Sequence, residues 1–206
     1  MAEGRHGHPG PQPATTVRDE DWYGDDLSGR IIEGVAYVRC DLAETTSRVG
    51  LVFTDCTFRT VKFNVSVHQG ASFANCTFLD CGFFGASFGE CKFVGAMFER
   101  CTFDQLSIAG GDWSFVGLPG ADLRNVTIRG TRLREADLTG ARCTGATIRD
   151  ADLSGAQLAK ANFDGCDLRG SDLSALDPWS ASLRGTRIDS VQAMTVALAM
   201  GLDVRD

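Results

Sequence analysis

The chain has an apolar residue at every fifth position over most of its length. This stripe runs from Phe53 to Ile188, and 26 of its 28 positions are apolar, with His68 and Pro178 as the two exceptions. In a chain that is 43% apolar, chance would place about twelve apolar residues in the stripe. A spacing of five matches neither the alternation of a strand nor the 3.6-residue turn of a helix. It therefore predicts stacked repeat units.

A second stripe, made of small residues, lies two positions before the first. Each five-residue unit would thus turn one large and one small side chain inward and leave three positions on a wet outer surface. All eight cysteines fall in these two stripes. We therefore expect them to pack as small hydrophobic residues, not to bind metal or form disulfides, in a reducing, cytoplasmic compartment.

The segment ADLTGARCTGATIRDADLSGAQLAKANFDGCDLRGSDL, from Ala136 to Leu173, closely resembles the pentapeptide-repeat family. The resemblance implies an all-β solenoid, a right-handed quadrilateral β-helix with four units per coil. Residues twenty apart would then stack, and the chain would form about eight coils. One such column is the expected structural core: Phe53, Phe73, Phe93, Trp113, Leu133, Leu153 and Leu173.

Three segments are expected along the chain. Residues 1–20 are rich in Gly, Pro and polar residues and predict a disordered tail, residues 21–188 form the β-helix, and residues 189–206 form a C-terminal capping and dimerisation helix. One extra residue within Ala43–Val52 breaks the register and predicts a bulge. At mid-rod we interpret Gly111 as compensating for the volume of Trp113.

The period of five stops after Ile188 and gives way to helical spacing. Asp189 and Gln192 have the arrangement of a capping box, and Gly201 is a typical helix stop, which predicts a helix from about Ser190 to Met200. This helix is apolar most of the way round, so it needs a second surface to bury against. We expect that surface to be a second copy of the chain, the alternative being a simple cap without dimerisation. The expected dimer interface comprises Trp179, Val191, Met194, Thr195, Leu198, Met200 and Leu202.

The run LDPWSASLRGTRIDSVQAMTVALAMGL, from Leu176 to Leu202, resembles the end of the MfpA-type quinolone-resistance branch of this family. The resemblance implies a cytoplasmic homodimer that mimics DNA, binds the type II topoisomerase DNA gyrase, and modulates it or protects it from fluoroquinolones or a natural toxin. The register is unbroken from Phe53 to Ile188, which leaves no room for projecting loops. It therefore favours the loop-less MfpA type over the Qnr type.

Among the aspartates that precede a large residue of the repeat, at a position that points outward in this family, two lie near its start, Asp26 and Asp41, and five lie in residues 122–172. We select the latter five. They are the candidate DNA-mimicking surface: Asp122, Asp137, Asp152, Asp167 and Asp172. Such carboxylates could stand in for phosphates, or they could only hydrogen-bond to turn backbone, and many arginines share this half of the chain. The net charge of −7 disfavours direct nucleic-acid binding. No apolar stretch is long enough to span a membrane.

An enzyme is the weakest of the functional hypotheses. General acid–base chemistry favours histidine, and the one histidine within the repeat, His68, lies in a core column. No cofactor is expected. The alternatives to a gyrase partner are a non-enzymatic scaffold for another cytoplasmic protein and, behind it, a biosynthetic-pathway enzyme with a site at the dimer junction.

Overall fold

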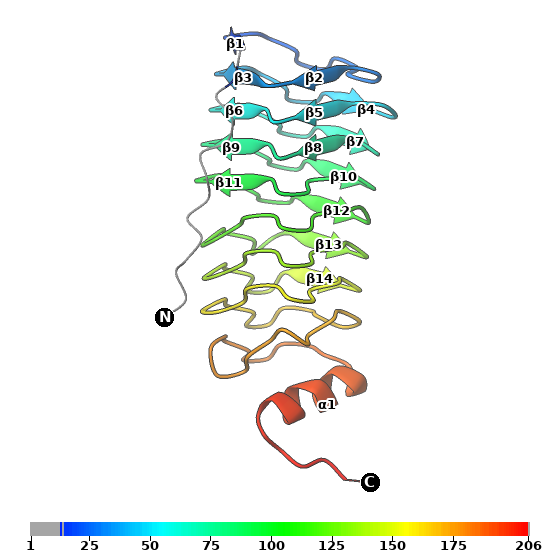
Figure 1. Ribbon diagram of the computed structural model, residues 1–206, viewed down its shortest axis with the longest axis vertical. Helices are drawn as coiled ribbons and strands as arrows, with labels where there is room; N and C mark the ends of the chain where they lie inside the picture. Colours follow the sequence, from blue (N-terminus) through cyan, green and yellow to red (C-terminus); the bar gives the residue numbers. More distant parts are fainter. Residues whose placement is uncertain (1–12, 14, 206) are drawn as a thin grey trace.

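The computed structural model describes residue 13 and residues 15–205. It is a parallel β-solenoid of about seven turns that ends in one helix (Figure 1). This confirms the expected fold class, although the number of complete turns is smaller than eight. The last coil pairs only in part: bridges join Asn162 to Ser182 and Asp167 to Arg187, but no β-bridge forms at Pro178.

The solenoid has four faces, which we number in chain order. Face 1 contains the three-stranded sheet of β2 (Ile31–Glu33), β5 (Val52–Thr54) and β8 (Ser72–Ala74). Face 2 contains the five-stranded sheet of β1 (Thr15–Arg18), β3 (Val35–Val38), β6 (Thr57–Arg59), β9 (Thr77–Leu79) and β11 (Met97–Glu99). Face 3 is joined by isolated parallel bridges, such as Lys62 to Gly82. Face 4 contains the six-stranded sheet of β4 (Thr46–Ser47), β7 (Val67–Gln69), β10 (Ser87–Gly89), β12 (Ser107–Ala109), β13 (Thr127–Arg129) and β14 (Thr147–Arg149).

Residues twenty apart pair across neighbouring coils, so each apolar column becomes a buried stack. The rings of Phe73 and Phe93 stack with centroids 4.7 Å apart, and Trp113 stacks on Phe93 at 4.0 Å. All seven residues of the expected core column are at most 4% exposed. The large apolar side chains thus fill the interior of the rod from coil to coil.

The first strand lies inside the segment for which composition predicted a tail. β1 pairs in parallel with β3, from Thr15 opposite Val35 to Arg18 opposite Val38. The ladder of strands therefore begins before residue 21. Residues 1–12 and 14 of that segment, with His6 and His8, lie outside the described residues.

The structure locates the extra residue of the first coils. Asp26 pairs with Thr46, twenty residues on, whereas Ile31 pairs with Val52, twenty-one residues on. The N–H of Leu27 bonds to the carbonyl of Thr46, nineteen residues on, whereas the N–H of Gly29 bonds to the carbonyl of Val49, twenty residues on, at 3.0 Å. The insertion therefore falls between Thr46 and Val49, just before Gly50, which adopts φ +78° and lies against Gly29 of the preceding coil.

Gly111 has a different role from the one that the sequence indicated. Its φ is +79°, and a Cβ there would lie 2.1 Å from the backbone oxygen of Cys91. The residue is thus required by a left-handed backbone and a close approach to the neighbouring coil. The interpretation of volume compensation for Trp113 is wrong, because the added atom would point at backbone.

Candidate functional site

Helix α1 (Ser190–Ala199) is fastened to the last coil through its first turn. Asp189 and Gln192 form the expected capping box, and the second carboxylate oxygen of Asp189 accepts from the N–H of Gly170 at 3.0 Å. The buried amide of Gln192 also donates to the carbonyls of Leu168 and Ser171, at 2.6 and 2.7 Å. One glutamine thus satisfies the helix start and two edge carbonyls of the solenoid.

The helix ends as the sequence predicted, one residue earlier than expected. Gly201 has φ +81°, its N–H bonds to the carbonyl of Leu198, and the N–H of Leu202 bonds to that of Ala197. This pair of bonds is a Schellman motif. The chain then leaves the rod below its last coil (Figure 1).

One side of α1 covers the end of the core, and the other is an uncovered apolar stripe. Val196 packs against the core, while Val191, Met194 and Leu198 are 76%, 48% and 58% exposed. These three lie on one side of the helix at spacings of three and four. Of the other expected interface residues, Trp179, Met200 and Leu202 are exposed as well and Thr195 is half-buried.

The end of the core is not filled completely. An apolar cavity of about 210 Å³ lies between the last coil and α1, and it is lined by Leu168, Leu173, Leu176, Leu183, Thr186, Ile188 and Val196. The cap therefore leaves apolar surface on both sides of the helix. Such exposed apolar surface is typical of a helix that packs against another protein surface as well as against its own last coil.

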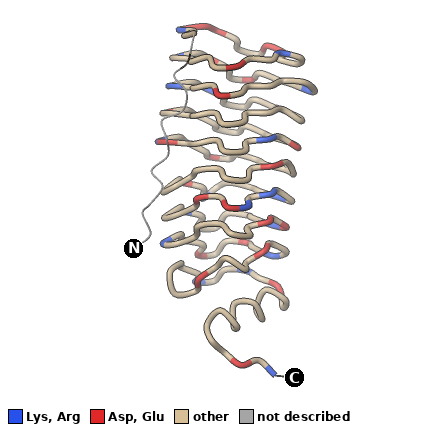
Figure 2. The backbone as a smooth tube through the Cα atoms, viewed as in Figure 1, with Lys and Arg blue, Asp and Glu red and all other residues tan. Residues whose placement is uncertain are grey.

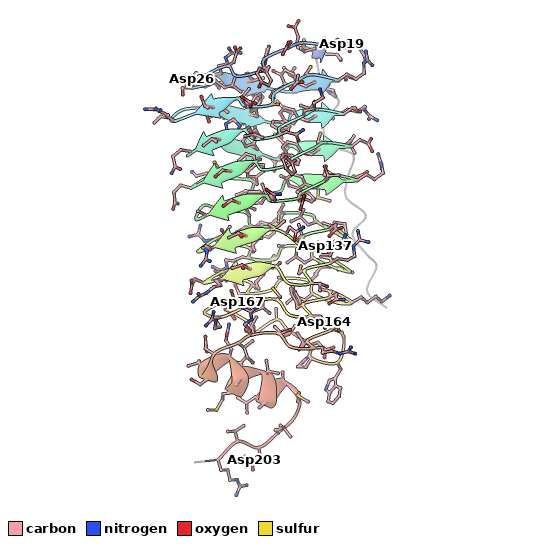
Figure 3. All side chains as sticks on the ribbon, turned by 180° about the vertical axis from the view of Figure 1, so that it is seen from behind. Asp19, Asp26, Asp137, Asp164, Asp167 and Asp203 are labelled. Carbon is pink, nitrogen blue, oxygen red and sulfur yellow. The ribbon has the colours of Figure 1, made fainter. Side chains whose placement is uncertain are left out.

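The five candidate aspartates do not form one row. Asp152 and Asp172 lie on face 1, Asp137 on face 2, Asp122 on face 3 and Asp167 on face 4, as their bridges to neighbouring coils and backbone hydrogen bonds show. Figure 3 shows Asp167 below β14, whereas Asp137 lies toward the other side of the rod. The sequence assumption that they share one surface is wrong, because units fifteen residues apart occupy different faces.

All five carboxylates accept a hydrogen bond from the backbone N–H two residues on, as the alternative interpretation supposed. Two of them are also neutralised by arginine. Asp122 is paired with Arg124 and Arg142 at 2.7 and 3.0 Å, and hydrogen bonds from Arg124 lower its pKa. Asp167 is buried and accepts two hydrogen bonds from Arg169, which lower its pKa to about 2. Neither is free to imitate a phosphate.

The other three lie on two adjoining faces with a further carboxylate. Asp152 and Asp172 occupy the same position in successive coils of face 1, and Asp137 lies on face 2. Glu135 lies beside Gly155 of the next coil in the same region, and we call these four residues the acidic edge.

Cations border the acidic edge without cancelling it. The nearest described contact is Arg134, whose Nε lies 3.7 Å from Asp152. Partial burial would raise the pKa of Asp152, but hydrogen bonds from Ser154 outweigh this effect, so the pKa is lowered and the carboxylate is ionised at neutral pH. Figure 2 shows acidic and basic residues interspersed along the rod.

His68 is the one histidine among the described residues, and it lies in the core. It is 1% exposed, and its Nδ1 lies 2.9 Å from the Ser47 hydroxyl. Burial lowers its pKa to about 4. A buried neutral ring without access to solvent has no substrate to act on.

The grooves on the rod are shallow and polar. One groove, of about 550 Å³, lies at the corner of faces 4 and 1, where Gly110, Gly111 and Gly130 leave space between Lys92 and Asp150. No cluster of three or more metal-ligating side chains occurs among residues 13 and 15–205. Within the same residues, no helix has the length and apolarity needed to cross a membrane. All eight cysteines are free thiols, and only Cys101 is not fully buried.

Comparisons with known proteins agree with this architecture. The family description "Pentapeptide repeat region" matches residues 51–138, and "Pentapeptide repeats (8 copies)" matches residues 136–174 and 149–189. No curated protein sequence matches the chain.

Solved structures of the same shape include two trypsin-treated forms of QnrB1, a plasmid-mediated fluoroquinolone resistance protein. One is 21% identical with a TM-score of 0.67, over 91% of this chain and 99% of that one. The other is 24% identical with a TM-score of 0.57, over 94% and 98%. At this identity the likeness establishes the fold.

Proposed function

The chain belongs to the pentapeptide-repeat family, and we propose that it is a non-enzymatic protein that binds DNA gyrase and modulates it or protects it from fluoroquinolones or a natural toxin. The observation that carries the proposal is a rod with the fold of a fluoroquinolone resistance protein that ends in an uncovered apolar helix. The resemblance of residues 176–202 to the MfpA-type branch adds the identity of the partner.

The working form in this proposal is a homodimer joined through α1. Val191, Met194 and Leu198 are more than two-fifths exposed on one side of the helix. A two-fold axis at this stripe would place the same residues of both copies against each other. The two rods would then extend in opposite directions and give a long, continuous surface.

The acidic edge is the part of this surface that we propose to meet the enzyme. A protein that binds DNA offers cations to its phosphates, and Asp137, Asp152 and Asp172 lie on adjoining faces. Asp122 and Asp167 are excluded from this role, because their own arginines occupy them. The free thiols suit a reducing cytoplasm.

The test of the dimer is gyrase supercoiling with added protein, with and without ciprofloxacin, using Leu198→Asp and the control Ala193→Asp. Both residues are exposed on α1, but Ala193 lies away from the apolar stripe. We expect the wild type and the control to be dimers that inhibit or protect the enzyme, and Leu198→Asp to be an inactive monomer. No effect from a folded wild-type dimer at micromolar concentration would overturn the gyrase proposal and leave a scaffold for another partner.

The test of the acidic edge compares the triple variant Asp137→Asn, Asp152→Asn, Asp172→Asn with the single variants Asp122→Asn and Asp167→Asn. We expect only the triple variant to lose binding to gyrase while it remains dimeric. Equal losses in all of the variants would show that general charge, and not this edge, attracts the enzyme.

A further inference from the structure

Face 4 carries the opposite charge from the acidic edge. In its C-terminal half Arg129, Arg149 and Arg169 occupy the same position in three successive coils, as the pairing of β13 with β14 and the bridge from Thr147 to Asp167 show. Arg187 follows in the next coil. Four arginines thus share this half of the face with Asp167, which lies in the column of Arg187, and with Asp189, which follows Arg169 in its column and accepts from Gly170, on a chain whose net charge is −7. Like charges directly opposite each other in a sheet repel.

Arg129, Arg149 and Arg169 occupy equivalent positions, but only Arg169 forms an ion pair with a carboxylate of the chain. In the third coil the residue two positions before the arginine is Asp167, and its carboxylate accepts from Nε and a terminal nitrogen of Arg169, at 2.9 and 2.7 Å. In the two coils above, the equivalent residues are Thr127 and Thr147. A hydroxyl thus stands where the carboxylate would be.

Arg129 and Arg149 consequently remain unpaired. Within the part of the chain that the structure describes, neither has a carboxylate within 4 Å. The Nε of Arg149 is also buried without a hydrogen-bond acceptor. Asp150, at the adjoining corner, is turned toward Gly170 of the next coil, where an added Cβ would lie 2.1 Å from its carboxylate oxygen. Arg129 and Arg149 thus lack the internal carboxylate that Arg169 has in Asp167.

We propose that Arg129 and Arg149 form a docking site for the acidic side of an α-helix in a partner protein, with one carboxylate on each guanidinium. Adjacent coils are about 4.8 Å apart. Carboxylates four residues apart on a helix rise about 6 Å, whereas side chains on one side of a strand are about 6.7 Å apart. The helix therefore matches the ladder to within about 1 Å per step, and the strand misses it by about 2 Å.

The neighbouring surface suits a helix and not a polyphosphate. Ser107, Thr127 and Thr147 form a column of short side chains on a flat sheet, so a helix can approach the arginines closely. A nucleic acid would bring many phosphates toward a rod whose other faces carry the negative excess. The inference does not depend on gyrase binding.

The experiment measures fluorescence anisotropy of a labelled alanine-based helical peptide with glutamates four residues apart on one side. A peptide of the same composition with the glutamates dispersed around the helix is the control ligand, and a single-stranded oligonucleotide of equal charge is the third. We expect the first peptide to bind at least tenfold more tightly than either.

The decisive variant is Thr147→Asp, which supplies Arg149 with an internal carboxylate in the manner of Asp167. Its control is Thr144→Asp, an exposed position on face 3 with the same charge change. We expect Thr147→Asp to weaken peptide binding at least tenfold and to melt no lower than the wild type, and Thr144→Asp to weaken binding less than threefold. Arg149→Gln should weaken binding to the same extent as Thr147→Asp.

Three results would overturn the inference. One is an equal loss in Thr147→Asp and Thr144→Asp, which would indicate general charge alone. Another is equal binding of the ordered and dispersed peptides. The third is tighter binding of the oligonucleotide, which would assign the arginines to nucleic acid. Gyrase assays on Thr147→Asp separate this site from the proposed function, since the dimer and the acidic edge are unchanged in it.

Discussion

Replacement of His68 by phenylalanine should make the protein more resistant to acid. The ring of His68 stacks on Phe88 with centroids 5.5 Å apart, so a phenylalanine fits the same column. Its pKa is about 4 in the folded chain, because burial disfavours the charged ring, and about 6.5 in the unfolded chain. Between these two pH values the imidazole of His68 is protonated in the unfolded chain but neutral in the folded chain.

The sign and size of the effect follow from this difference. The lowered pKa leaves stability intact above about pH 6.5 and removes it as the pH falls toward 4. Between pH 7.5 and pH 4.5 the wild type should lose about 2.5 kcal/mol through this group alone. In His68→Phe the hydroxyl of Ser47 loses its partner, but that cost is independent of pH.

The assay is urea unfolding of both proteins at the two pH values, followed by circular dichroism. The free energy of unfolding of His68→Phe should rise relative to the wild type by about 2.5 kcal/mol on acidification. Both proteins share His6, His8 and every carboxylate, so the difference isolates one ring. A difference that stays constant between pH 7.5 and pH 4.5 would refute the account of a buried neutral histidine.

Three further outcomes are expected. Gly111→Ala should destabilise the chain by about 3–4 kcal/mol in thermal or urea unfolding, because the added Cβ would lie 2.1 Å from the backbone oxygen of Cys91. The control is Gly140→Ala, where φ is also positive but the added Cβ has open space. It should cost about 1–2 kcal/mol. Gln192→Ala should cost about 2–4 kcal/mol and speed hydrogen exchange in α1, since two carbonyls lose their donor, whereas the exposed Gln157→Ala should be nearly neutral. Cys101 should be alkylated by iodoacetamide before the other seven cysteines, as mass spectrometry of digests can show, because it alone is not fully buried; simultaneous labelling of all eight would contradict the intact coil.

The repeat made the interior of this protein predictable. A period of five over 28 positions requires stacked units, and the residues of that stripe, from Phe53 to Leu173, are the ones that fill the rod. The helix that closes it was predictable for a similar reason. A capping box at Asp189 and Gln192 and a glycine at position 201 are local signals, and local hydrogen bonds satisfy them in the structure.

The contacts between surface side chains were less predictable, because the stacking of coils, and not the order of residues along the chain, decides which side chains lie next to each other. Asp122 and Asp137 occupy the same position in their units, yet they lie on different faces, and Asp122 is paired with Arg142 of the next coil. The grouping of carboxylates into an acidic edge therefore required the stacking of residues twenty apart. The strand at Thr15–Arg18 is a similar case, since it is held by pairing with β3 in the following coil.

The sequence by itself determined that the chain is a solenoid, which side chains fill it, and where its terminal helix begins. Spacing along the chain carries this information, because burial repeats with the unit. The tertiary structure alone decided that Gly111 avoids the backbone of Cys91, that the extra residue lies near Gly50, and that Arg129 and Arg149 lack the carboxylate that Arg169 has. These features depend on contacts between coils, where residues far apart in the chain come within a few ångströms of each other.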